Sequence, residues 1–187
     1  DADRIPVNKL GLRIEAAMAF GTGHHGTTRG CLLLLDRLAR RGIRPHRVAD
    51  IGCGTGVLAM AAAKAWRVHC VVADIEEVAV ATAAENARAN CLHPWITCQR
   101  AAGFHSPALR RGAPYDLILA NILAAPLRRL APDMACHLAP GGRVILSGLL
   151  CGQARGVLEI YRGHGFVPQD RINLGEWSSL MMRKPCA

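Results

Sequence analysis

The stretch 48–56, V-A-D-I-G-C-G-T-G, constrains the fold of this chain more than any other. An apolar run with strand character ends at Asp50 and Ile51, a turn with glycine at every second position follows, and Val57 to Lys64 has the composition of a helix. Glycines in this spacing allow a sharp turn and let a ligand approach the backbone closely. The unpaired N–H groups that open the helix then face that ligand. The stretch therefore predicts a strand, a ligand-binding turn and a helix.

An acid at the end of the next apolar run indicates what kind of ligand this turn binds. The spacing G-x-G-x-G differs from the dinucleotide fingerprint and, alone, also fits an ordinary strand-to-helix turn. The run from His69 to Ala73 ends at Asp74, after a length that one helix and one strand fill. A carboxylate there is placed to accept hydrogen bonds from both hydroxyls of a ribose, although it can also cap the following helix. We expect a nucleoside-bearing cofactor.

The rest of the chain alternates between strand and helix patterns, which predicts an α/β fold. The expected strands cover 47–51, 69–73, 95–99, 115–120, 143–147, 166–174 and 177–183, and the expected helices 29–40, 57–65, 76–90, 126–137 and 153–164. We expect a short strand within residues 1–14 and a turn at 140–142. Residues 100–114 read as an irregular stretch, and Thr27 or Thr28 can cap the helix that follows. We expect one domain over 1–187, with a mostly parallel, Rossmann-like sheet of seven strands, helices on both faces, and a C-terminal hairpin around Gly175 that adds an antiparallel strand at the edge.

Charge and composition narrow the classes of partner. The chain has 23 basic and 14 acidic residues, a net charge of +9, and only 4% aromatic residues. This charge permits contact with RNA or an acidic partner. Because the basic residues are scattered and stacking side chains are few, we expect a generally basic surface and no dedicated nucleic-acid groove. The sequence contains no apolar run long enough to cross a bilayer, so we expect no membrane protein. It also shows no secretion signal, which predicts a cytoplasmic protein.

The eight cysteines have neither C-x-x-C spacing nor a neighbouring histidine at zinc-ligand spacing. We expect reduced thiols that fill the core and no metal. Cys53, in the glycine turn, is open to a second interpretation, because a helix N-terminus can lower the pKa of a thiol.

Four segments should meet where the parallel strands end: the glycine turn, Asp74, the loop after Gln99, and the segment 121–124 after the fourth strand. Ligands of such sheets bind at the carboxyl ends of the strands. The four segments therefore predict a single crevice.

Three stretches of the chain carry a resemblance to a known family. Residues 19–28, A-F-G-T-G-H-H-G-T-T, resemble a loop A-F-G-T-G-x-H-x-T-T, and residues 121–127, N-I-L-A-A-P-L, resemble a segment N-I-L-A-x-P-L. Residues 50–56 resemble the cofactor turn of the same proteins, and 147–150 and 175–177 are supporting matches. With these features the chain resembles class I S-adenosylmethionine-dependent methyltransferases, and more narrowly the PrmA family, the methyltransferases of ribosomal protein L11.

The resemblance implies S-adenosylmethionine as cofactor and a set of site residues. The implied cofactor-binding residues are Phe20, Gly21, Thr22, His25, Thr28, Asp50, Gly52, Gly54, Asp74 and Asn121. Asn121 is also the implied catalytic residue, with a carbonyl that accepts a hydrogen bond from the incoming amine, or else a cap of the next helix. Phe20 covers the sulfonium or belongs to the core, and His25 orients its loop or lies on the surface.

The resemblance also implies methyl transfer to a lysine or N-terminal amine of a protein substrate, ribosomal protein L11. We expect the chain to be a monomer. A glutamine amide, a nucleobase or a small molecule is an alternative acceptor. The amide and nucleobase families usually have N-P-P-[YF], where this chain has Ile122 and Leu123. A non-catalytic cofactor-binding module is a third hypothesis. Full-length members of the family carry an N-terminal substrate-recognition domain, and since Phe20 lies so near the start, we expect the catalytic domain alone.

Overall fold

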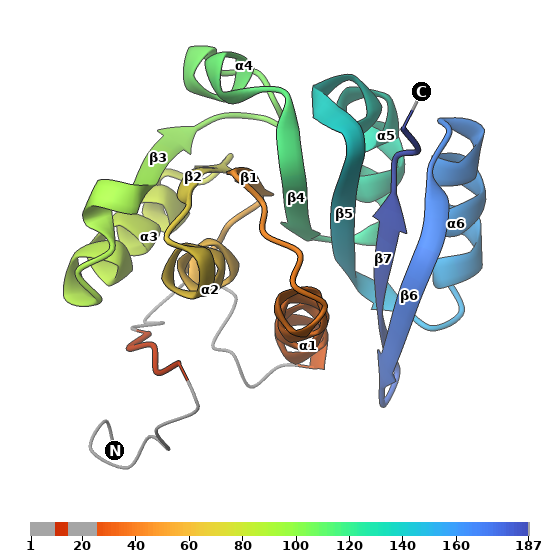
Figure 1. Ribbon diagram of the computed structural model, residues 1–187, viewed down its shortest axis with the longest axis horizontal. Helices are drawn as coiled ribbons and strands as arrows, with labels where there is room; N and C mark the ends of the chain where they lie inside the picture. The colour runs from red at the N-terminus through yellow and green to blue at the C-terminus, as the bar shows by residue number, and fades with distance from the viewer. Residues whose placement is uncertain (1–9, 15–25, 187) are drawn as a thin grey trace.

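The apolar runs of the sequence form one central sheet of seven strands (Figure 1). The structure is a computed structural model that describes residues 10–14 and 26–186. The strand order is β3-β2-β1-β4-β5-β7-β6. The strands are β1 (Arg47–Ile51), β2 (His69–Asp74), β3 (Ile96–Arg100), β4 (Tyr115–Asn121), β5 (Leu138–Leu150), β6 (Val167–Leu174) and β7 (Trp177–Arg183). Neighbouring strands from β3 to β5 pair in parallel, whereas β7 pairs antiparallel with both β5 and β6.

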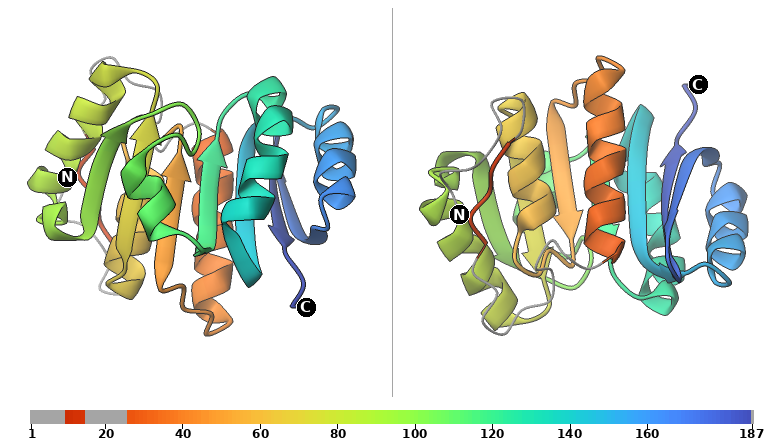
Figure 2. Two further views of the ribbon diagram at one scale, coloured as in Figure 1. Left: turned by 90° about the horizontal axis from the view of Figure 1, so that it is seen from above. Right: turned by 90° about the horizontal axis from the view of Figure 1, so that it is seen from below.

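Helices cover both faces of this sheet (Figure 2). One face carries α1 (Gly26–Arg40), α2 (Val57–Trp66) and α3 (Glu77–Ala89), the other α4 (Pro107–Gly112), α5 (Ala124–His137) and α6 (Ala154–Gly163), and a short 3-10 helix, η2 (His93–Trp95), precedes β3. Successive side chains of a strand point to opposite faces, so Val48 enters one apolar core and Ala49 the other. Burial on both faces explains why the parallel strands are continuous apolar runs. The predicted fold class is confirmed.

The C-terminal hairpin adds antiparallel strands at the edge of the sheet, as predicted. The hairpin forms around Gly175 as expected, with Leu174 paired to Trp177. Its second strand, β7, inserts between β5 and β6 and is not the edge strand. The sequence favours this position, because Leu180, Met181 and Met182 of β7 are all buried, whereas most of β6 is exposed or half-buried. The more apolar strand takes the interior position.

Three local predictions are wrong. Helix α1 begins at Gly26, so Thr27 and Thr28 lie inside its first turn and do not cap it. Gly26 packs against Trp177 and Leu174, and this contact with the hairpin accompanies the longer helix. Residues 100–114 include the helix α4, where Ser106 caps the Leu109 N–H at 3.1 Å. Residues 140–142 belong to β5, and backbone hydrogen bonds tie them to the segment after β7.

Residues 10–14 carry no regular secondary structure but are held to α3. The Arg13 N–H donates to the Asn90 side chain at 2.8 Å, and the Asn90 amide donates to the Arg13 carbonyl at 2.7 Å. The predicted short strand otherwise falls on residues outside the described part of the chain. Among the described residues, no helix has both the length and the apolar character needed to cross a membrane.

Candidate functional site

The glycine turn after β1 is fixed by hydrogen bonds to the next strand. The N–H groups of Gly52 and Cys53 both donate to the carbonyl of Ala73, at 2.8 and 3.1 Å. Gly52, Gly54 and Gly56 have φ angles of 71°, 52° and 75°, a backbone conformation that residues with a Cβ rarely adopt. Helix α2 starts directly after Gly56, which makes no side-chain cap bond, and in its first turn the Ala59 N–H is bound by Asp50.

The absence of a side chain at Gly52 also lets the turn approach the segment after β4. A Cβ on Gly52 would lie 2.3 Å from a methyl carbon of Ile122, closer than any real contact. Gly148, on β5, has the same relation to this segment, since its Cβ would lie 2.3 Å from the Ile122 carbonyl oxygen. The predicted convergence of the glycine turn with 121–124 is therefore present, and two glycines make it possible.

Asp74 lies at the end of β2, half-buried, and holds two backbone groups. Its Oδ2 accepts a hydrogen bond from the Gly54 N–H at 3.0 Å, and its Oδ1 accepts one from the Glu76 N–H at 3.1 Å. The second contact supports the turn into α3, as the capping alternative requires. Each carboxylate oxygen can accept a further hydrogen bond. Asp74 can therefore anchor the glycine turn and still accept two hydroxyl groups.

Asp50 is a buried carboxyl with one unsatisfied oxygen. It is 1% exposed, its Oδ2 accepts from the Ala59 N–H in the first turn of α2 at 3.1 Å, and its Oδ1 has no partner among the described residues. Burial raises the pKa of Asp50 to about 7, although the Ala59 hydrogen bond lowers it, and the charge of Asp74 adds to the increase. Because buried polar groups in native proteins are almost always paired, this oxygen indicates a place for a hydrogen-bond donor.

The pKa of Asp50 leads to a pH-dependent stability. In the unfolded chain the carboxyl releases its proton near pH 4, whereas in the native state it holds the proton up to about pH 7. Its contribution to stability is therefore complete below pH 4 and is lost as the pH rises through 7. An Asp50→Asn variant lacks this titration. We expect its free energy of unfolding, relative to that of the unmodified chain, to rise between pH 4 and 8 by up to roughly 4 kcal/mol. Urea denaturation across this range measures the difference, and parallel pH profiles would contradict the assignment.

Cys53 is buried beside these acids. Burial raises the pKa of its thiol well above the ordinary value, and the charges of Asp50 and Asp74 raise it further. The activated-thiol alternative is therefore wrong. Cys53 fills space in the turn.

Asn121, the last residue of β4, contacts helix α1. Its Nδ2 donates to the Thr28 hydroxyl at 3.3 Å, and Thr28 is 1% exposed. Asn121 does not cap α5, whose N-cap residue is Leu123 and has no side-chain cap bond. The hydrogen bond orients the amide so that Nδ2 faces α1, and Oδ1 has no partner among the described residues. Two of the predicted site residues thus lie together, ninety-three positions apart in the sequence.

A buried hydroxyl pair that the sequence analysis missed holds the start of α1 in place. Ser147 on β5 and Ser179 on β7 are 2.7 Å apart, and both lie within hydrogen-bond distance of the Thr27 carbonyl, at 3.2 and 3.5 Å. A Cβ at Gly30 would lie 2.2 Å from the Ser179 hydroxyl oxygen, so the glycine allows α1 to approach this pair. Ser147 was quoted only as part of a supporting match, and no local pattern pairs it with Ser179.

The structure therefore brings together the glycine turn, Asp50, Asp74, Thr28 and Asn121 around the carboxyl ends of β1, β2 and β4. The other predicted site residues, Phe20, Gly21, Thr22 and His25, lie outside the described residues.

Comparisons with known proteins identify the family to which the chain belongs. The family model described as ribosomal protein L11 methyltransferase (PrmA) matches residues 2–185. A ribosomal protein L11 methyltransferase from Bradyrhizobium diazoefficiens is 55% identical over 98% of this chain, and the match covers 62% of that relative. The crystal structure of a ribosomal protein L11 methylase from Lactobacillus delbrueckii subsp. bulgaricus has a TM-score of 0.85 at 30% identity, covering 98% of this chain and 91% of the other.

A third similarity extends to the fold alone. An RNA methyltransferase from Salinibacter ruber, crystallised with S-adenosyl-L-homocysteine, has a TM-score of 0.62 at 17% identity, covering 82% of this chain and 91% of the other. The chain spans about three fifths of the length of the curated relatives that it matches. Because the family model covers almost every residue, the chain belongs to the ribosomal protein L11 methyltransferase (PrmA) family.

Proposed function

We propose that this chain binds S-adenosylmethionine and transfers its methyl group to amines, lysine side chains or an N-terminal amine, of ribosomal protein L11. One observation carries the proposal: within a chain of this family, Asp74, the glycine turn and the Asn121–Thr28 pair are joined at one edge of the sheet. A ribosomal protein as substrate implies a cytoplasmic enzyme.

The residues of the crevice fit such a cofactor. Its ribose has two adjacent hydroxyls, which match the two oxygens of Asp74. Its methionine part carries an ammonium group, and the unpaired Oδ1 of Asp50 supplies an acceptor for a donor of this kind. The positive φ angles of Gly52 and Gly54 give the glycine turn its sharp bend beside Asp74. When bound, S-adenosylmethionine supplies a methyl group on a positively charged sulfur, which a nucleophile can attack in line.

The chain's own contribution is to align and desolvate the acceptor. An amine must be unprotonated to attack, and a free lysine has a pKa near 10.4. Exclusion of water lowers that pKa, so a strong protein base is not required. The Oδ1 of Asn121 can accept a hydrogen bond from the neutral amine, and Thr28 keeps the amide in the orientation that presents this oxygen.

A direct assay tests the proposal. Purified L11 is incubated with the chain and S-adenosylmethionine carrying a labelled methyl group, and the label is located by mass spectrometry of peptides. A full-length relative serves as the positive control, and S-adenosylhomocysteine as a competitor. We expect label on L11 amines that the competitor suppresses. Label on glutamine amides, or binding of the cofactor without transfer to L11 or its peptides, would contradict the proposed acceptor.

A further inference from the structure

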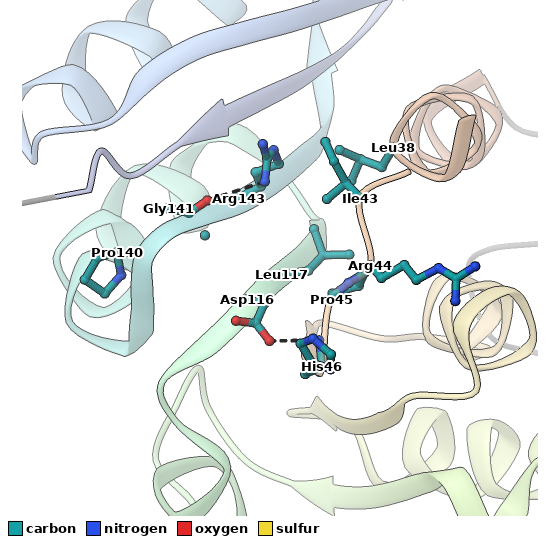
Figure 3. A pocket seen from close by; sticks show the side chains of 11 residues that line it. Leu38, Ile43, Arg44, Pro45, His46, Asp116, Leu117, Pro140, Gly141 and Arg143 are labelled. Atoms are coloured by element: carbon teal, nitrogen blue, oxygen red, sulfur yellow. Dashed lines mark hydrogen bonds between the residues drawn. The ribbon is translucent and has the colours of Figure 1, made fainter. Parts of the chain in front are cut away.

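Two hollows lined in part by basic side chains lie at the amino ends of the parallel strands, the edge of the sheet opposite the candidate site. The first, of about 210 Å³, lies between the loop after α1 and the starts of β4 and β5 (Figure 3). The second, of about 340 Å³, lies beside the C-terminal end of α2 and is lined in part by Lys64, Trp66 and Arg67. Arg44 lines both hollows and so connects them.

Two guanidinium groups next to the first hollow share a single acceptor. Arg143 of β5 and Arg183 of β7 are paired in register. Arg143 Nη1 and Arg183 Nε both donate to the Gly141 carbonyl, at 3.4 and 3.3 Å. Their other contacts are the Gln169 amide oxygen at 3.0 Å and the Cys186 sulfur at 3.3 Å. None of these acceptors is a carboxylate.

The acids of this edge do not neutralise the pair. Asp170 is bound by Arg37 at 2.6 Å and by Arg41 at 3.4 Å. Asp116 accepts the N–H groups of His46 and Arg47 with its Oδ2, and Figure 3 shows it at the other end of the hollow from Arg143. Among the described residues no carboxylate forms an ion pair with Arg143 or Arg183.

The electrostatics of Arg143 agree with an uncompensated charge. Burial lowers the pKa of its guanidinium, and the like charges of Arg183 and Arg41 lower it further, whereas Cys186 acts in the opposite direction as the smallest of these effects. Cations near the end of a helix can be explained by the helix dipole, and this accounts for Lys64 in the last turn of α2. It does not account for two arginines on adjacent strands.

A bound phosphate would relieve this repulsion, since the guanidinium fork matches its oxygens. Beyond Arg44, the second hollow is lined by two more cations and by the half-buried Trp66. Within the described part of the chain, Lys64 donates to the Gly11 carbonyl alone, at 2.6 Å. Successive cations along a track, with an aromatic side chain among them, suit a chain of phosphates better than one free anion.

We propose that this basic edge, from Arg143 and Arg183 through Arg44 to Lys64, Trp66 and Arg67, binds the phosphate backbone of a single-stranded nucleic acid. The proposal goes beyond methyl transfer and does not depend on it. It also revises the expectation of a generally basic surface without a nucleic-acid groove.

Fluorescence anisotropy with a labelled single-stranded RNA oligonucleotide tests the proposal. The double variant Arg143→Gln/Arg183→Gln should bind at least about tenfold more weakly, because each charge-assisted contact is strong. Loss of two phosphate contacts should also reduce the slope of log K against log salt by about 1.4. The control Arg128→Gln/Arg155→Gln removes the same charge from α5 and α6 and should change affinity less than about twofold.

A second variant guards against misfolding. Arg44→Gln/Arg67→Gln changes two exposed side chains that have no described partner, and it should weaken RNA binding in the same direction while thermal melts remain unchanged. If the control pair and the test pairs lost RNA affinity equally, net charge alone would explain binding, and the proposal would be wrong. So would an unmodified chain that binds inorganic phosphate but no RNA, since the edge would then hold only small anions.

Discussion

Replacement of Asp74 with alanine should weaken S-adenosylmethionine binding by about 1.5–3 kcal/mol, a roughly 10- to 150-fold rise in Kd. The variant removes the carboxylate proposed to accept the ribose hydroxyls. It also removes the acceptor of the Gly54 N–H, so the glycine turn loses one of its anchors. Both effects weaken binding of the same ligand, and isothermal titration calorimetry measures their sum.

The control for this variant is Asp36→Ala, which makes the same chemical change on the exposed side of α1, where Arg40 is the ion-pair partner of Asp36. It should leave the Kd unchanged. Thermal melts of the Asp74 variant establish that the sheet is intact. A Kd equal to that of the unmodified chain would contradict the ribose assignment and leave Asp74 as the support of the turn into α3.

Replacement of Asn121 with alanine should reduce turnover roughly tenfold to a hundredfold, because a misplaced acceptor loses in-line alignment. The Kd for S-adenosylmethionine should change much less, since the proposed partner of Asn121 Oδ1 is the amine. Steady-state kinetics with L11 as substrate, compared with calorimetric affinities, separate the two quantities.

Thr28→Val tests how Asn121 is held. Valine keeps the shape of threonine but cannot accept the hydrogen bond from Asn121 Nδ2. The amide is then free to rotate, and we expect a smaller loss of turnover in the same direction. If Asn121→Ala transfers methyl groups at the unmodified rate, or if affinity and turnover fall in equal measure, Asn121 has no specific role toward the acceptor.

The sequence predicted the parts of this molecule that local patterns encode. The buried strands β1, β2 and β4 are continuous apolar runs that end at or near polar residues. The glycine turn is recognisable from glycines at every second position. Their convergence follows from the topology of parallel sheets. For the same reason Asp74 and Asn121 were recognisable as residues of one crevice.

Features that depend on tertiary pairing could not be predicted. Ser147 and Ser179 are separated by thirty-two positions, and their contact exists only because β7 inserts beside β5. The order of β6 and β7 in the sheet depends on which of the two strands is more apolar and therefore pairs with β5 in the interior. The Arg143–Arg183 pair arises from the same insertion, which places two basic residues that are distant in the sequence next to each other.

The most direct test of the account is a crystal structure of the chain with S-adenosyl-L-homocysteine. The account predicts the ribose hydroxyls on the carboxylate of Asp74, the methionine part beside Gly52 and Gly54, and a donor on the free oxygen of Asp50. A ligand bound instead at the opposite edge of the sheet, in the hollow between Asp116 and Arg143, or no ligand at saturating concentration, would contradict it.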